Sequence, residues 1–104
     1  MKDAITEVQA SVFMEYKAIR AKEKFEAMNN SPHESYAVIL EEFEEAQSEA
    51  FMFEINLRSY WNGIKASTMT KCQLEQMQSI AEKAAAEWVQ VAAMCYKATK
   101  DKEE

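Results

Sequence analysis

Residues 32–64 read PHESYAVILEEFEEAQSEAFMFEINLRSYWNGI, and the spacing of apolar residues in this stretch decides the fold. Apolar residues recur at alternating steps of four and three, the pattern of a helix that packs lengthwise against other helices. Ser31 precedes the stretch as a helix cap, and Pro32 suits a first helical turn because proline has no N–H to leave unpaired. We therefore predict a helix over residues 32–64, with a seam of Ile39, Phe43, Ala46, Ala50, Phe53, Leu57, Tyr60 and Ile64.

Two further helices flank this one. Residues 3–28 carry apolar side chains three or four positions apart, and residues 70–99 repeat the four-three alternation. Gly63 and the polar run 67–70 mark the interruption between the second and third helices, with Ser67 or Thr70 as the next cap. No segment has the two-residue period of a strand. We expect one all-α domain over residues 1–104, a bundle of three long amphipathic helices. The seam predicted for the third helix comprises Leu74, Met77, Ala81, Ala84, Trp88, Val91, Cys95 and Ala98.

Composition limits the classes of partner. The chain has 104 residues, 48% of them hydrophobic, which is enough for one modest core. Its net charge of −6 repels phosphate backbones and anionic lipid surfaces, so we expect neither nucleic acid nor a membrane as partner. The N-terminus has no apolar signal core, and no run approaches the roughly 20 apolar residues of a membrane span. These features predict a cytoplasmic protein, in which Cys72 and Cys95 are reduced thiols, buried or half-buried.

Some apolar residues lie outside the two predicted seams. A small chain with surplus apolar surface favours burial against a second copy of itself. We therefore expect a homodimer or homotetramer. The surplus residues are Phe51, Met52, Trp61, Ile80, Val89 and Met94.

An acidic cluster, EEFEE, occupies residues 41–45 of the central helix. A projection at ~100° per residue places Glu42, Glu45 and Glu49 along one strip on the flank of the predicted seam. Glu41 lies at the margin of the strip, and Glu44 points elsewhere. The cluster therefore resolves into a line of carboxylates beside the core.

The third helix carries a carboxylate on the matching flank, at Glu87. If the second and third helices pack antiparallel, carboxylates of the two helices face each other at the edge of the bundle. Several carboxylate oxygens in one place suit Mg²⁺, which keeps some of its waters and leaves positions for substrate phosphates. The pattern therefore predicts a divalent cation site.

These acidic residues resemble the motifs of a known enzyme family. Glu41-Glu42-Phe43-Glu44-Glu45 matches the EExxE motif, and Glu87-Trp88-Val89-Gln90 resembles the ExxD motif, of the MazG-like all-α nucleoside triphosphate pyrophosphohydrolases. The flanking sequence is similar too, so the resemblance covers roughly residues 31–98. The first helix is similar only in being helical and amphipathic.

The resemblance implies an activity and a set of ligands. Members hydrolyse a nucleoside or deoxynucleoside triphosphate to the monophosphate and pyrophosphate with Mg²⁺, for which Mn²⁺ is an alternative ion. By this resemblance Glu41, Glu42, Glu45 and Glu87 hold the ion, together with Gln90 at the motif's aspartate position. Glu42 or Glu45 would accept the proton of the attacking water.

Gln90 leaves a second interpretation open. An amide oxygen coordinates a cation more weakly than the carboxylate it replaces, so metal affinity or activity would be weakened or lost. The alternative is a noncatalytic helical oligomerisation or interaction module. Because His33 is the only histidine, the chain lacks the Glu-x-x-His pairs of di-iron proteins and a serine or cysteine triad.

Overall fold

The computed structural model describes residues 2–22 and 31–102, and these form three α-helices. They are α1 (Lys2–Lys22), α2 (Pro32–Ala66) and α3 (Lys71–Lys102). Within the described ranges the chain contains helix and no strand, which confirms the all-α prediction. The predicted helix over 3–28 is confirmed to residue 22, and its last six positions lie outside the described residues. The other two helices extend two or three residues beyond their predicted ends at 64 and 99.

Local capping explains where α2 and α3 begin. Ser31 is extended, its hydroxyl oxygen accepts a hydrogen bond from the Glu34 N–H at 3.2 Å, and Pro32 follows in the first turn. At the start of α3, the Thr70 hydroxyl accepts from the Gln73 N–H at 3.2 Å, and the Gln73 amide oxygen accepts from the Thr70 N–H at 3.0 Å. This reciprocal pair is a capping box, so the predicted caps Ser31 and Thr70 are confirmed.

The turn between α2 and α3 follows Gly63 by several residues. Gly63 is buried inside the last turns of α2, where a Cβ atom would lie 3.3 Å from the backbone of Met69. The last residue of α2 is Ala66, and the next residue, Ser67, caps the helix in a left-handed conformation with φ 58°. The Thr68 N–H donates to the Gly63 carbonyl at 2.7 Å and closes the C-terminal cap. Gly63 therefore permits the close approach of the returning chain.

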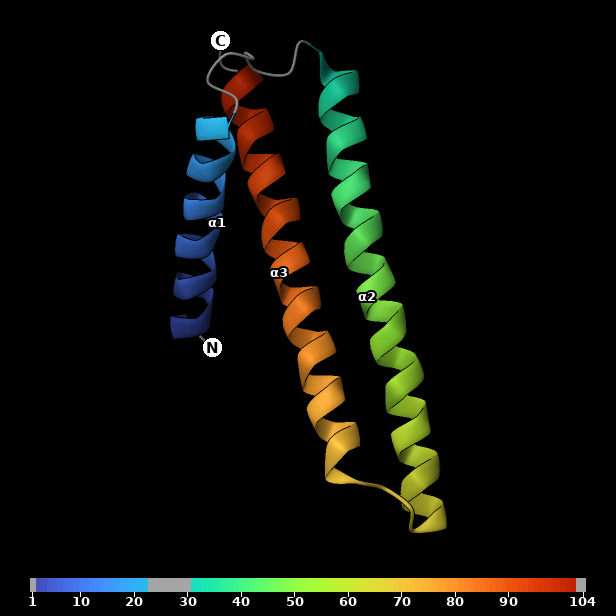
Figure 1. The fold of residues 1–104 in the computed structure, drawn as a ribbon. Helices are drawn as coiled ribbons and strands as arrows, with labels where there is room; N and C mark the ends of the chain where they lie inside the picture. Colours follow the sequence, from blue (N-terminus) through green and yellow to red (C-terminus); the bar gives the residue numbers. More distant parts are fainter. Residues whose placement is uncertain (1, 23–30, 103–104) are drawn as a thin grey trace.

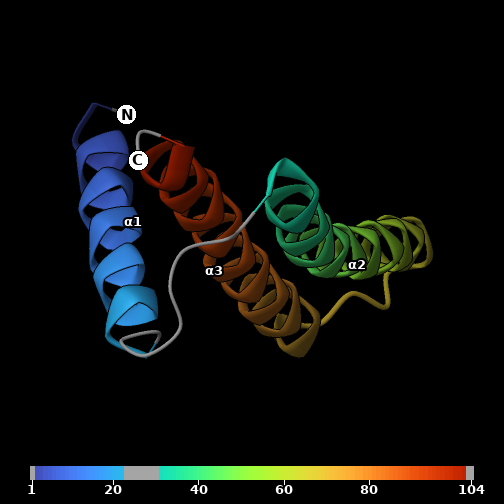
Figure 2. The same ribbon diagram turned by 90° about the horizontal axis from the view of Figure 1, so that it is seen from above.

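The three helices lie side by side, with α3 in the middle (Figure 1). Helix α3 packs against both neighbours, whereas α1 and α2 make no contact with each other in the described part of the chain. The view from above shows the same order (Figure 2). The molecule measures 58 × 29 × 22 Å. Its radius of gyration is 17.6 Å, against about 13 Å for a compact domain of this length. The α2–α3 hairpin therefore has open sides.

The contact between α2 and α3 differs from the predicted seams at every second position. Ile39, Ala46 and Phe53 face α3 as predicted, but the intervening contacts are made by residues one position earlier than predicted, such as Glu42 in place of Phe43. The same shift occurs in α3, where Glu87 replaces Trp88. Hydrophobicity alone favoured the apolar neighbour in each case, and the two acidic residues are half-buried instead. The seam of α2 is Ser35, Ile39, Glu42, Ala46, Glu49, Phe53, Asn56, Tyr60 and Gly63, and that of α3 is Gln73, Met77, Ile80, Ala84, Glu87, Val91, Met94 and Ala98.

The displaced apolar residues are largely exposed. Leu57, Leu74 and Trp88 each retain 47% of their accessible surface. Cys95 is another predicted seam residue whose place in the helix contact is taken by the residue before it, Met94. Cys72 lies in the first turn of α3. Both are exposed free thiols, so the prediction of buried or half-buried cysteines is wrong.

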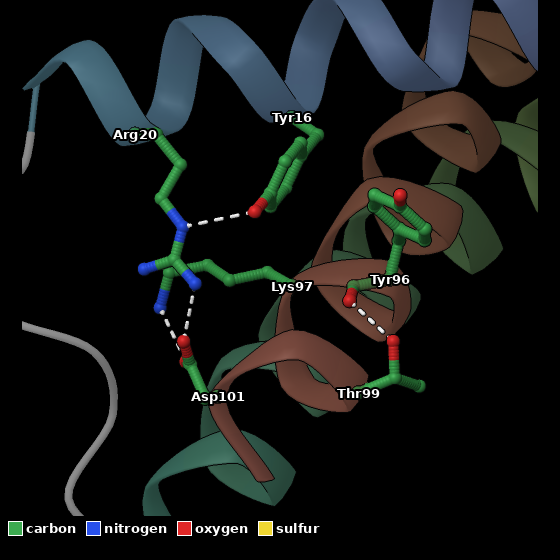
Figure 3. A network of polar contacts seen from close by, with 6 residues as sticks. All are labelled: Tyr16, Arg20, Tyr96, Lys97, Thr99 and Asp101. Atoms are coloured by element: carbon green, nitrogen blue, oxygen red, sulfur yellow. Dashed lines mark hydrogen bonds and ion pairs between the residues drawn. The ribbon is translucent and has the colours of Figure 1, made fainter. Parts of the chain in front are cut away.

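A charged network joins the end of α1 to the end of α3 (Figure 3). The Arg20 guanidinium donates to the Tyr16 hydroxyl at 3.3 Å and pairs with the Asp101 carboxylate. The Lys97 ammonium, only 2% exposed, pairs with Asp101 at 3.3 Å. The rings of Tyr16 and Tyr96 meet edge to face at 4.8 Å. The bond to Tyr16 and the nearby Asp101 carboxylate raise the pKa of Arg20, while burial opposes them. The network fixes the register of α1 on α3.

None of the helices, in the residues described, combines the length and the apolar character needed to cross a lipid bilayer.

Candidate functional site

Three carboxylates gather on one side of α2. One oxygen each from Glu41, Glu42 and Glu45 lies within 4.8 Å of the others. The three residues are one and four positions apart on a continuous helix, which places their side chains over a single turn. Glu41 and Glu45 are exposed and Glu42 is half-buried. The group contains Glu42 and Glu45 of the predicted strip and Glu41, which was placed at its margin, whereas Glu49 lies outside it; Glu44, predicted to point elsewhere, is exposed.

Glu87 of α3 joins this group from across the helix contact. Its carboxylate lies close enough to those of Glu45 and Glu49 for both to raise its pKa. The antiparallel packing of α2 and α3 thus brings together two acidic motifs that lie far apart in the sequence. They are Glu41–Glu45 and Glu87.

Two carboxylate oxygens in the cluster are buried and have no hydrogen-bond partner. They are Oε2 of Glu42 and Oε2 of Glu87, one from each helix. Burying an acceptor without a donor is unfavourable, and a buried carboxylate without a counter-charge is more so. Lys and Arg are the usual counter-charges for such groups, and the ion pairs of Arg20, Arg58 and Lys97 lie elsewhere in the structure.

The ionisation of the cluster reflects this crowding. Burial raises the pKa of Glu42 above its ordinary value, and the neighbouring carboxylates of Glu45 and Glu87 raise it further. Burial also raises the pKa of Glu87, and the adjacent carboxylate of Glu45 raises it further. Like charges held together in a desolvated place disfavour their own ionised forms. A divalent cation would reverse this balance by supplying the missing positive charge.

A further carboxylate, Glu15 of α1, was not identified from the sequence. It is half-buried and lies close enough to Glu42 to raise the pKa of that residue. Glu15 stands alone between Val12 and Tyr16 in a helix without an acidic motif, so its place depends on how α1 packs.

Glu15 also lines a pocket of about 520 Å³ between α1 and α3. Gln90 lines the same pocket, and the remaining walls are mostly small or apolar. Gln90, predicted as a ligand with Glu87, therefore lies beside α1 and Glu15, and outside the group of Glu41, Glu42 and Glu45. The pocket and the carboxylate cluster meet at Glu15. Its walls are Ala10, Ser11, Met14, Glu15, Ala86, Val89 and Gln90.

The donor set fits a hard divalent cation. Carboxylate oxygens from two helices converge, two of them buried and unpartnered, and exposed Glu41 and Glu45 leave one side open. Mg²⁺ and Mn²⁺ prefer oxygen ligands of this kind. The same set lacks the histidines of a di-iron centre.

Comparison of the chain with protein-family models, with curated proteins and with solved structures gave no significant match.

Proposed function

We propose that the chain is a magnesium-dependent nucleoside triphosphate pyrophosphohydrolase of the MazG-like kind. The observation that carries the proposal is the pair of buried, unpartnered carboxylate oxygens of Glu42 and Glu87, which come from two helices and belong to one cluster. Their burial is unfavourable in the metal-free protein, and binding of a cation is the simplest way in which it becomes favourable. The sequence motifs EExxE and Glu87-Trp88-Val89-Gln90 supply the family assignment.

In this proposal Glu41, Glu42, Glu45 and Glu87 hold Mg²⁺, or Mn²⁺ in its place, and Glu15 is an additional candidate ligand from α1. When bound, the ion supplies positive charge for the triphosphate and lowers the pKa of a coordinated water. The acidic residues alone would repel a polyphosphate at the chain's net charge of −6.

The chemistry assigned to the side chains is a single displacement. The oxygen of a water attacks the α phosphorus, the bond from that phosphorus to the bridging oxygen breaks, and pyrophosphate leaves with the bridging oxygen. The proton of the water passes to Glu45 or Glu42. Glu45 is the more accessible of the two, because it is exposed and Glu42 is half-buried.

Pyrophosphate release tests the proposal. The wild-type protein, with a panel of nucleoside and deoxynucleoside triphosphates and Mg²⁺, should release pyrophosphate and the monophosphate. Glu45→Gln should abolish release, while Glu44→Gln on the same helix should not, because Glu44 lies outside the cluster. Failure of the folded wild-type protein to turn over any member of the panel would overturn the assignment.

The second candidate function is a noncatalytic helical interaction module. It is favoured by the position of Gln90, which supplies no charge to the cluster, and by the apolar side chains that α2 and α3 leave exposed. A module of this kind would bind no divalent cation in a saturable way. Self-association, as a homodimer or homotetramer, is proposed under either function.

A further inference from the structure

The α2–α3 hairpin has an apolar face on one of its sides. We define this apolar face by six residues that follow the seam positions of the two helices: Phe43, Leu57, Trp61 and Ile64 on α2, and Leu74 and Trp88 on α3. The rings of Phe43 and Trp88 meet edge to face at 5.8 Å, which shows that both helices turn these residues to the same side of the hairpin. Five of the six residues keep between 36% and 57% of their surface exposed. They are Leu57, Trp61, Ile64, Leu74 and Trp88.

This face carries few charged side chains, and those present offset one another. Two charged residues of α2 border it: Glu54, which is paired with Arg58 of its own helix at 2.6 Å, and Lys65, whose ammonium lies 5.7 Å from the centroid of the Trp61 ring. The carboxylates Glu41 and Glu45 lie on the other side of the seam, toward Glu87. A chain with a net charge of −6 can approach a second copy of itself at such a face with little repulsion.

The chain as a whole exposes more surface than a compact monomer of the same mass. The accessible surface is 7891 Å², whereas a compact monomer of 12.0 kDa exposes about 6,000 Å². The excess of roughly 1,900 Å² belongs to the whole elongated chain, of which the apolar face is one part, and it exceeds the roughly 800 Å² that each partner buries in an interface of standard size. Two hairpins that join along such faces form a four-helix bundle.

The residues of the face are also arranged in complementary layers. Starting from the contact of Phe43 with Trp88, a step of seven residues along each antiparallel helix pairs Ala50 with Ala81 at the next level. A bulky layer thus stands one heptad, about 10 Å, from a small one. A two-fold axis between these levels, perpendicular to the helices, would set the bulky layer of one copy on the small layer of the other.

We propose that the apolar face is the interface of a homodimer, in which two hairpins pack antiparallel and Phe43 and Trp88 of each copy fill the space over Ala50 and Ala81 of the other. The interface lies on the side of the hairpin away from Glu41 and Glu45, so it does not depend on the proposed hydrolase activity. A different protein on this face is the competing occupant.

Sedimentation equilibrium of the full chain, with circular dichroism as a check on folding, tests the interface. The wild-type protein should have twice the mass of 12.0 kDa, and Leu57→Lys should reduce it to one chain with its helix content retained. Ile55→Lys is the matched control, because Ile55 is 46% exposed on the same helix and lies away from the face. This variant should remain dimeric. Leu74→Lys repeats the test from α3 if Leu57→Lys loses its helix content.

A wild-type protein that sediments as one chain at about 100 µM would overturn the proposal and favour a different partner. Dissociation by Ile55→Lys but not by Leu57→Lys would equally contradict it. Ala81→Trp tests the layers. The added apolar surface would strengthen unspecific association. In this dimer, however, the new side chain would fill the space that Trp88 of the other copy occupies, so the dimer should weaken. A stronger dimer in Ala81→Trp would refute the antiparallel register.

Discussion

The rings of Phe43 and Trp88 meet edge to face, with their centroids 5.8 Å apart and their planes at 65°. This contact sets the register of the antiparallel helices α2 and α3. It separates two sides of the hairpin, because the residues next to it in sequence, Glu42 and Glu87, turn into the helix contact instead. One side of the hairpin is apolar, and the other holds the carboxylate cluster.

The first prediction concerns stability without metal. The pKa of Glu42 and of Glu87 lies above the ordinary value of 4.5 in the folded protein. Their contribution to the unfolding free energy is therefore fully present below pH 4.5 and is lost as the pH rises through the raised pKa values. In metal-free buffer, Glu42→Gln should raise the melting temperature at pH 7 and flatten its decline from pH 5 to pH 7. Glu44→Gln should change neither, and an equal gain from both variants would contradict the account.

The second prediction concerns Gln90. Restoring the charge of the family motif with Gln90→Asp should increase metal affinity or pyrophosphate release by about tenfold, the low end of what a change near a metal site produces. Gln90→Asn, which keeps the neutral amide, should give no gain. Kinetics at limiting Mg²⁺ measure the effect. An unchanged Mg²⁺ requirement in Gln90→Asp would mean that the side chain at position 90 does not contribute to cation binding by the cluster.

The third prediction concerns the attachment of α1. Asp101→Ala removes the carboxylate that pairs with both Arg20 and the buried Lys97, and should destabilise the protein by about 3 kcal/mol. Glu54→Ala breaks the exposed pair with Arg58 and should cost less than about 1 kcal/mol. Urea unfolding measures both variants. Similar losses in the two would show that the network does not fix α1.

The fourth prediction concerns the end of α2. Ser67 has φ 58°, a conformation that glycine adopts more easily than serine. Ser67→Gly should therefore stabilise the protein by about 0.5 to 1 kcal/mol. Ser59→Gly, in the interior of the same helix, should destabilise it by about 0.5 kcal/mol. A loss of stability in Ser67→Gly would contradict the assigned cap.

Much of the fold was predictable from sequence because its signals are local. Helix ends followed from Ser31, Pro32 and Thr70, whose side chains or ring act within one turn. The face that α2 turns to α3 was predicted at only half of its positions. Apolar periodicity favoured Phe43, but Glu42 occupies the contact. A half-buried acidic residue in a helix contact breaks the usual pattern, and departures of this kind are typical of functional sites.

The carboxylate cluster was predictable in part. Glu41, Glu42 and Glu45 are close in sequence, so their grouping on one turn followed from helix geometry alone. The approach of Glu87 required the antiparallel packing of α3, which entered the sequence analysis only as a condition. Glu15 could not be identified, because its place depends on the long-range packing of α1 against α3 at the Arg20–Asp101 pair.

Titration of the protein with Mn²⁺, followed by electron paramagnetic resonance of the free ion, tests the central claim most directly. The account predicts one saturable site per chain in the wild-type protein, weakened at least tenfold in Glu87→Gln and unchanged in Glu44→Gln. Binding that is absent, or that Glu87→Gln leaves intact in a folded protein, would contradict a metal site built by α2 and α3 together.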